Sequence, residues 1–155
     1  MNTSFKFQSR STLMICMVAT VSFLAACSSK PPDCADEKTL NLIKGLIVEN
    51  SKDMSNRVDG KYRQDAVRYV DALKIEIKNI VSDGYNAEAK KHSCTGAFVI
   101  TTLNAMTFTG SQSYTSQATA GDSSKFVVNV PGIESLFNTL NNDLGTYVVE
   151  LGAKR

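Results

Sequence analysis

Leu73-Lys74-Ile75-Glu76-Ile77-Lys78 is the stretch of sequence that decides the fold, because apolar and charged side chains alternate along it. Successive side chains of a β-strand point to opposite faces of the sheet. A period of two therefore predicts a strand that has Leu73, Ile75 and Ile77 on a buried face and charged side chains in water. A sheet with one apolar face needs a second layer to cover that face.

Three further strands are predicted after this stretch, and residues typical of turns or short links separate them. Ser82-Asp83-Gly84, Asn104-Ala105 and Gly121-Asp122 predict the three connections, and Pro131-Gly132 ends the last strand. The predicted strands cover residues 91–103, residues 106–118, where Met106, Phe108 and Tyr114 share a face, and the alternating run Phe126, Val128 and Val130. Parallel strands need crossovers of about a dozen residues or more. The short connections therefore predict an antiparallel meander of four strands.

A helix is predicted before the sheet. Its apolar face contains residues at helical spacing, namely Thr39, Leu42, Ile43, Leu46, Ile47 and Asn50. The helix is expected to begin near Cys34, with Asp33 or Asp36 as its N-cap, and to end near Ser51. The polar residues 52–61 predict a loop. A short second helix is expected after the loop, with Tyr62, Ala66, Tyr69 and Val70 on one side.

An amphipathic helix is predicted after Pro131. Its apolar stripe consists of Ile133, Leu136, Phe137, Leu140 and Leu144, and Gly145 is expected as its C-cap. The stripe can pack on the body of the same domain, which is the more common arrangement, or it can dock on a partner protein. Tyr147-Val148-Val149 is expected either to add an edge strand or to fray.

The predicted fold class is α+β, with an N-terminal helix packed on a four-stranded antiparallel meander and a C-terminal amphipathic helix. The chain has 155 residues, 43% of them hydrophobic and 21% charged. This size and composition fit one globular domain, which we assign to residues 34–155. Over residues 34–131 the order of helix and curled sheet resembles small cystatin-like and nuclear-transport-factor-like folds. No diagnostic motif accompanies this resemblance, and a fold by itself does not fix a function.

The amino terminus has the layout of a secretory signal peptide. Lys6 and Arg10 precede an apolar run over residues 13–23, which is much shorter than the roughly 20 residues that a membrane-spanning helix needs. The next four residues, Leu24-Ala25-Ala26-Cys27, resemble the lipobox of bacterial lipoproteins. The combination of this motif with the preceding layout identifies residues 1–26 as a lipoprotein signal peptide.

The resemblance to lipoproteins implies cleavage after Ala26 and a diacylglycerol on the Cys27 thiol, with a further acyl chain such as palmitate on the new amino group. Several acyl chains hold a protein on a membrane essentially permanently. Residues 27–33 are then a flexible tether in the periplasm. In many Gram-negative lipoproteins an Asp after the lipidated cysteine retains the protein in the inner membrane. Here Ser28 and Ser29 follow, which favours the outer membrane.

The signal peptide and the lipid account for Cys16 and Cys27, which leaves Cys34 and Cys94. In an oxidising compartment these two cysteines are expected to form a disulfide. The rival interpretation makes Cys34, Cys94 and His92 metal ligands. Zinc sites use three or four protein ligands, and the sequence has neither a close cysteine pair nor a His-x-x-x-His spacing. We therefore expect no metal and no cofactor apart from the covalent lipid, and we place His92 at a strand edge.

The charge balance and the missing motifs disfavour several classes of function. The chain has 17 basic and 15 acidic residues, and removal of Lys6 and Arg10 with the signal peptide makes the mature part neutral, which disfavours nucleic acid as a partner. Phosphate-binding loops, a nucleophile elbow and paired carboxylates beside Trp are missing from the sequence, so we expect no enzyme. The leading hypothesis is a lipoprotein that binds or braces another envelope protein, as a secretion or conjugation accessory, an inhibitor or an immunity protein.

The alternative hypothesis is a periplasmic protein that binds a small ligand. A helix over a curled sheet can leave an apolar pocket. Here the pocket would be lined by Phe98, Phe108, Tyr114 and Phe126. The same four aromatic side chains can equally well be core residues, because a small domain needs large apolar side chains to fill its interior.

Overall fold

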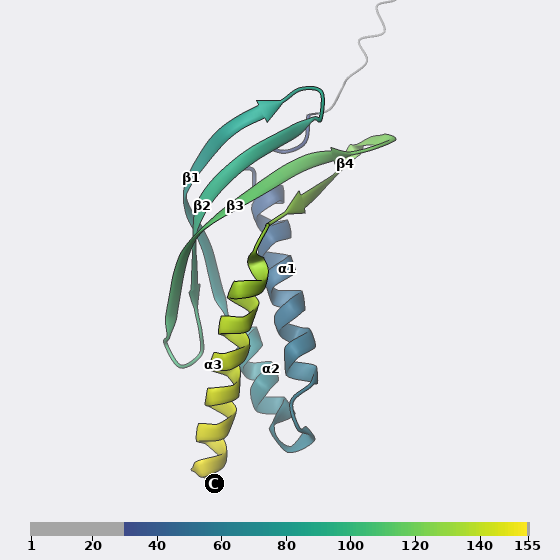
Figure 1. The fold of residues 1–155 in the computed structure, drawn as a ribbon. Helices are drawn as coiled ribbons and strands as arrows, with labels where there is room; N and C mark the ends of the chain where they lie inside the picture. The colour runs from purple at the N-terminus through teal and green to yellow at the C-terminus, as the bar shows by residue number, and fades with distance from the viewer. Residues whose placement is uncertain (1–29, 155) are drawn as a thin grey trace, which may run out of the picture.

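The computed structural model describes residues 30–154, except for the side chain of Ser123, so the predicted signal peptide and Cys27 lie outside the described residues. The elements are α1 (Glu37–Asn56), a 3-10 turn (Gly60–Tyr62), α2 (Arg63–Asp71), β1 (Lys74–Asn86), β2 (Lys91–Thr101), β3 (Thr107–Thr119), β4 (Asp122–Asn129) and α3 (Ile133–Ala153) (Figure 1). The strands form one sheet in the order β1-β2-β3-β4, and all neighbours are antiparallel. The predicted α+β class and the four-stranded meander are confirmed.

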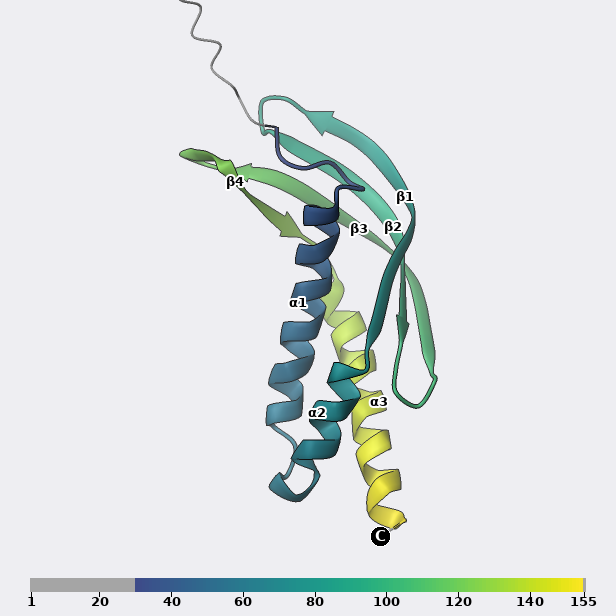
Figure 2. The same cartoon turned by 180° about the vertical axis from the view of Figure 1, so that it is seen from behind.

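The helices cover the concave side of a strongly curled sheet. Figures 1 and 2 show α1 and α3 along this side from opposite directions, with α2 at the end of the domain where α3 finishes. The first described residues lie at the other end, beside the β1–β2 and β3–β4 turns. The two ends of the described chain therefore lie at opposite ends of the domain.

The main core lies between the concave face of the sheet and the two long helices. From Cys94 to Ile100 along β2 every second residue is buried, as expected for a strand with one apolar face. The core cluster combines residues from the helices and the sheet, among them Ile43, Ile47, Cys94, Phe98, Ile100, Tyr114 and Leu140. The predicted packing of the N-terminal helix on the meander is therefore present.

Helix α1 is longer than its sequence pattern predicts. It begins at Glu37 behind the N-cap Asp36 and continues to Asn56, so the predicted end near Ser51 is wrong. Ser51 and Ser55 are buried on the helix, and their hydroxyls donate to the carbonyl oxygens of Ile47 and Lys52 at 2.9 and 2.8 Å. These bonds satisfy the serines inside the helix, so a polar stretch remains helical.

Strand β1 runs through the predicted turn at Ser82-Asp83-Gly84 and ends at Asn86. Its pairing with β2 shifts between Lys78 and Val81 and again between Ser82 and Gly84. Gly84 has a φ of 146°, a conformation that glycine adopts at little cost. The glycine thus accommodates a β-bulge in an edge strand instead of a chain reversal, and the turn follows at residues 87–90.

Helix α3 continues through Gly145 to Ala153, so the predicted C-cap and the predicted edge strand at Tyr147-Val148-Val149 are both wrong. Leu144 and Val148 are buried in a second apolar cluster with Tyr69 of α2. A glycine inside a helix costs only about 1 kcal/mol relative to alanine. Burial of two aliphatic side chains is worth more than that, which explains why the helix does not end at Gly145.

Residues 30–33, predicted as part of the tether, lie against the domain. Pro31 is buried, and the Lys30 ammonium lies 4.9 Å from the centre of the Tyr85 ring. The Thr39 hydroxyl donates to the carbonyl oxygen of Pro32 at 3.5 Å. In the sequence only Ser28 and Ser29 separate Cys27 from this packed segment.

Raising the pH is expected to destabilise the domain through Tyr114. Its hydroxyl donates to the carbonyl oxygen of Cys34 at 2.8 Å, and burial, followed by the charge of Asp33, raises the pKa of Tyr114 from 10.0 to about 12. The stability that protonated Tyr114 contributes is therefore complete below about pH 10 and is lost as the pH rises towards 12. Urea unfolding should be measured at several pH values between about 9 and 12. Over this range the free energy of unfolding of the native domain should fall by up to about 3 kcal/mol more than that of Tyr114→Phe. Equal losses in the two proteins would contradict this prediction.

Candidate functional site

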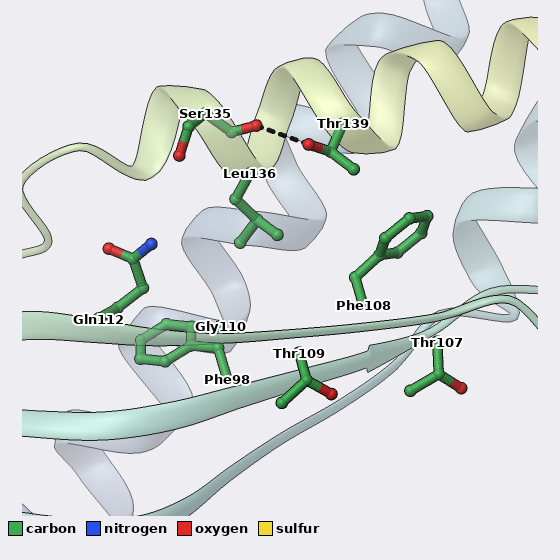
Figure 3. A pocket seen from close by; sticks show the side chains of 9 residues that line it. All are labelled: Phe98, Thr107, Phe108, Thr109, Gly110, Gln112, Ser135, Leu136 and Thr139. Carbon is green, nitrogen blue, oxygen red and sulfur yellow. Dashed lines mark hydrogen bonds between the residues drawn. The ribbon is translucent and has the colours of Figure 1, made fainter.

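Two of the surface grooves beside the helices have an apolar lining, and the first lies between β3 and α3. We call it the β3–α3 groove. It has a volume of about 350 Å³ and is lined by Phe98, Thr107, Phe108, Thr109, Gly110, Gln112, Ser135, Leu136 and Thr139. In Figure 3 the side chains of Leu136 and Phe108 extend into the space between the helix and the strands. Apolar side chains therefore lie inside this groove, and no charged side chain is among its lining residues.

The second groove lies between α1 and β4, and we call it the α1–β4 groove. It has a volume of about 510 Å³ and is lined by Asn41, Leu42, Ile43, Gly45, Leu46, Glu49, Phe126, Val127 and Val128. Leu42, Leu46 and Val127 are 46%, 43% and 51% exposed. Three exposed aliphatic side chains around one groove form an apolar patch, whereas apolar side chains that are exposed singly are ordinary on a protein surface.

The four aromatic residues that were predicted to line one pocket lie in different parts of the domain. Phe98 and Tyr114 are buried in the core, where their rings meet edge to face with centroids 6.2 Å apart. Phe98 also reaches the β3–α3 groove, which Phe108 lines as well. Phe126 lines the α1–β4 groove. The four side chains thus do not share one pocket.

Cys34 and Cys94 form the predicted disulfide, with their Cα atoms 5.6 Å apart. The bond joins the segment before α1 to the central strand β2. Cys94 pairs with Tyr114 on the next strand. Because both sulfurs are consumed, the two cysteines are not available as metal ligands. Within residues 30–154 no group of three or more His, Cys, Asp or Glu side chains could hold a metal ion.

His92 does not lie at the edge of the sheet. It is the second residue of β2, which has neighbours on both sides, and it pairs with Tyr85 and Ser116. The centres of the His92 and Tyr85 rings are 4.6 Å apart. The predicted edge position is therefore wrong, because β1 extends beyond Gly84 and covers the start of β2.

A polar cluster ties α2, α3 and the β2–β3 turn together. The Tyr69 hydroxyl donates to Asp143 Oδ2, and the Asn104 amide donates to Asp143 Oδ1 at 3.4 Å. The Thr102 hydroxyl in turn donates to the side-chain oxygen of Asn104. Burial, and then the hydrogen bond to Asp143, raises the pKa of Tyr69 well above its usual value. Tyr69 therefore stays protonated and buried, which suits a structural hydrogen bond rather than proton transfer.

Sequence reasoning missed most residues of the two grooves. It placed Leu42 and Leu46 on the buried face of the first helix, but they are 46% and 43% exposed. The buried stripe of α1 consists of residues four positions apart, namely Thr39, Ile43, Ile47, Ser51 and Ser55. Gly110 was not singled out, although an isolated glycine inside a strand often marks a close approach of another chain. No sequence pattern indicates that Ser135 and Thr139 line a groove, because only the packing of α3 places them beside β3.

Comparisons of the chain with protein-family models, with curated proteins and with solved structures found no match. The resemblances to lipoproteins and to cystatin-like folds therefore stay predictions. In the part of the chain from Lys30 to Lys154, no helix has the length and apolar character needed to cross a bilayer.

Proposed function

We propose that this protein is a lipid-anchored lipoprotein of the bacterial cell envelope, without enzymatic activity, that binds another envelope protein through the α1–β4 groove. The single observation that carries the binding function is the apolar patch of Leu42, Leu46 and Val127 around this groove. Exposed apolar patches of this kind mark interaction surfaces.

The position of the first described residues supports an interaction close to the membrane. Extended chain spans at most about 3.6 Å per residue, so the three steps from Cys27 to Lys30 place Lys30 within about 11 Å of a lipidated Cys27. The segment after Lys30 packs near β4, because Pro31, Pro32 and Phe126 line one hollow. A partner in the α1–β4 groove would therefore itself be held at the outer membrane, facing the periplasm.

Replacing Leu46 by Glu is expected to abolish partner binding without unfolding the domain. Leu46 is 43% exposed, so a carboxylate at this position remains in water in the free protein. In the complex the same carboxylate would be buried without a counter-charge, which costs several kcal/mol. Crosslinking in intact cells, followed by purification of the lipoprotein, should recover a specific partner with the native chain and at least about tenfold less with Leu46→Glu.

Val149→Glu is the matched control, because Val149 is an apolar residue of α3 that is 72% exposed and lies outside both grooves. This variant should recover as much partner as the native chain. Recovery of the monomer alone from native cells would contradict the proposed function. Equal recovery with Leu46→Glu and Val149→Glu would show that the α1–β4 groove is not the binding surface.

Replacing Cys27 by Ala is expected to leave a longer precursor without lipid. Lipoprotein maturation requires the thiol on which the diacylglycerol is placed before cleavage. Mass spectrometry of the envelope fraction should find the native chain with acyl chains on Cys27, and the variant with residues 1–26 still attached. Normal cleavage of the variant, or a native protein without lipid, would contradict the anchor.

A small apolar ligand is the second candidate occupant of the α1–β4 groove. Its volume of about 510 Å³ lies within the range typical of small-molecule sites. The groove opens to solvent, and the interior behind it is filled by core residues such as Ile43. Native mass spectrometry of the domain purified from envelopes tests this alternative, which predicts a bound compound that disappears in Leu46→Glu.

A further inference from the structure

Among the described strands, the first eight of the 13 residues of β3 have a neighbour on one side only. Strand β4 pairs with Thr115–Thr119. The preceding residues, from Thr107 to Tyr114, pair with β2 alone among the described strands. This open edge forms one wall of the β3–α3 groove, to which Thr109, Gly110 and Gln112 contribute.

The hydrogen-bond pattern fixes which backbone groups face the open side. The N–H of Thr102 donates to the carbonyl oxygen of Met106 at 2.9 Å, and the N–H of Ala118 donates to the carbonyl oxygen of Lys90 at 3.1 Å. The backbone groups of even-numbered residues at both ends of β3 therefore point towards β2. Backbone groups alternate in direction along a strand. The N–H and C=O groups of Thr109, Ser111 and Ser113 therefore point away from β2, and these residues are exposed.

Helix α3 does not satisfy these groups. The hydroxyl of Ser135, which lines the groove, donates instead to the carbonyl oxygen of Gly132 at 3.0 Å. The hydroxyl of Thr139 donates to the carbonyl oxygen of Ser135 at 2.9 Å, also within α3 (Figure 3). A Cβ atom built on Gly110 would meet nothing within 4 Å. The space between the strand edge and the helix is therefore open, and both sides of it present uncharged groups.

We propose that the β3–α3 groove binds an extended, uncharged segment of a partner protein, which pairs with Thr109, Ser111 and Ser113 as an added strand. Backbone hydrogen bonds would provide affinity, and alternate apolar side chains of the segment would contact Phe108 and Leu136, as in other cases of strand addition. This site is separate from the α1–β4 groove, so either proposal can stand without the other.

A single segment fits the groove better than a second copy of this chain. Antiparallel pairing of two β3 edges would place both α3 helices on the same face of the joined sheet. Each α3 already borders the groove, so two helices would compete for the space above the joint. Because no lining residue is charged, the affinity for the segment should change little with salt concentration.

The test begins with the purified domain from Lys30 onward, in which the disulfide is formed. Heptapeptides that bind this domain are selected from a random library displayed on phage. Amide hydrogen exchange should be fast at Thr109, Ser111 and Ser113 in the free domain and slow after a selected peptide is added. Gly110 and Gln112, which bond to β2, should exchange slowly in both states. The same peptide with N-methyl groups on alternate residues should not bind.

Ser111→Pro and Ser111→Ala are the matched variants, because Ser111 points to the exposed convex face and only the proline removes its N–H. Proline is tolerated where the N–H of an edge strand faces away from the ladder. Loss of one backbone hydrogen bond should weaken peptide binding by about tenfold in Ser111→Pro, whereas Ser111→Ala should stay within about twofold of the native domain. Circular dichroism should show that both variants are folded.

Several results would overturn the strand-addition site. These are equal peptide affinity of the proline and alanine variants, selection of no peptide that protects the three amides, and a dimeric free domain in which those amides are already protected. A partner captured in cells through Leu46 would remain valid in each case, because that experiment does not involve β3.

Discussion

Unfolding of a Cys34→Ala, Cys94→Ala double variant is expected to require about 4 kcal/mol less free energy than unfolding of the native domain. The disulfide spans a sequence separation of 60 residues, and the chain-entropy model assigns about this stabilisation to a loop of that length. Domains of this size have a total stability of about 5–15 kcal/mol, so the loss is a large fraction. Urea unfolding of both proteins at neutral pH measures it.

Reduction of the native domain provides the control for this prediction. A reducing agent should lower the midpoint of native unfolding towards that of the double variant and should not affect the variant itself. In the chain-entropy model the loss arises in the unfolded state, because the unfolded chain gains conformational freedom when the bond is absent. Equal midpoints of the native domain with and without reductant would show that the bond contributes nothing.

Replacing Leu140 by Ala is expected to destabilise the domain by about 2–5 kcal/mol, the range measured when a buried aliphatic side chain is truncated and leaves a cavity. Leu140 is completely buried in the main core, where α3 faces α1 and the sheet. Thermal and urea unfolding of the isolated domain should both report the change. The measurement also distinguishes between two interpretations of α3, as a helix that packs on its own domain or as a helix that docks on a partner protein.

Val149→Ala is the matched substitution on the same helix. Val149 is 72% exposed, so its truncation should change the free energy of unfolding by less than about 0.5 kcal/mol. Similar small effects at Leu140 and Val149 would mean that α3 is not part of the folded core in solution. That result would favour the alternative interpretation of this helix as a docking element.

Local patterns were sufficient to predict the elements of the fold. The alternation around Ile75 specifies a strand with one buried face, and the helical spacing of Ile43 and Ile47 specifies the face of α1 that packs on it. Both patterns follow from backbone geometry alone, with a period of two in strands and 3.6 in helices. The disulfide was also predictable, because the predicted signal peptide and the resemblance to a lipobox would account for the other two cysteines.

Element boundaries were not predictable where tertiary contacts keep a residue inside a helix or strand that its type would usually end. Gly84 and Gly145 both suggest an end of an element, but the first lies in a bulge of β1 and the second inside α3. Ser51 and Ser55 suggest a loop, but their hydroxyls bond to carbonyl oxygens of the helix. In each case contacts from residues distant in the sequence stabilise the longer element.

The sequence by itself therefore determined the order of helices and strands, the buried faces apart from Leu42 and Leu46, and the pairing of Cys34 with Cys94. Only the tertiary structure decided where the two grooves lie and which backbone groups remain unpaired. The lengths of β3 and β4 and the path of α3 after Pro131 leave Thr109, Ser111 and Ser113 with β2 as their one neighbour among the described strands. A local pattern specifies which side of an element is apolar, but the absence of a neighbour depends on how distant elements are arranged in space.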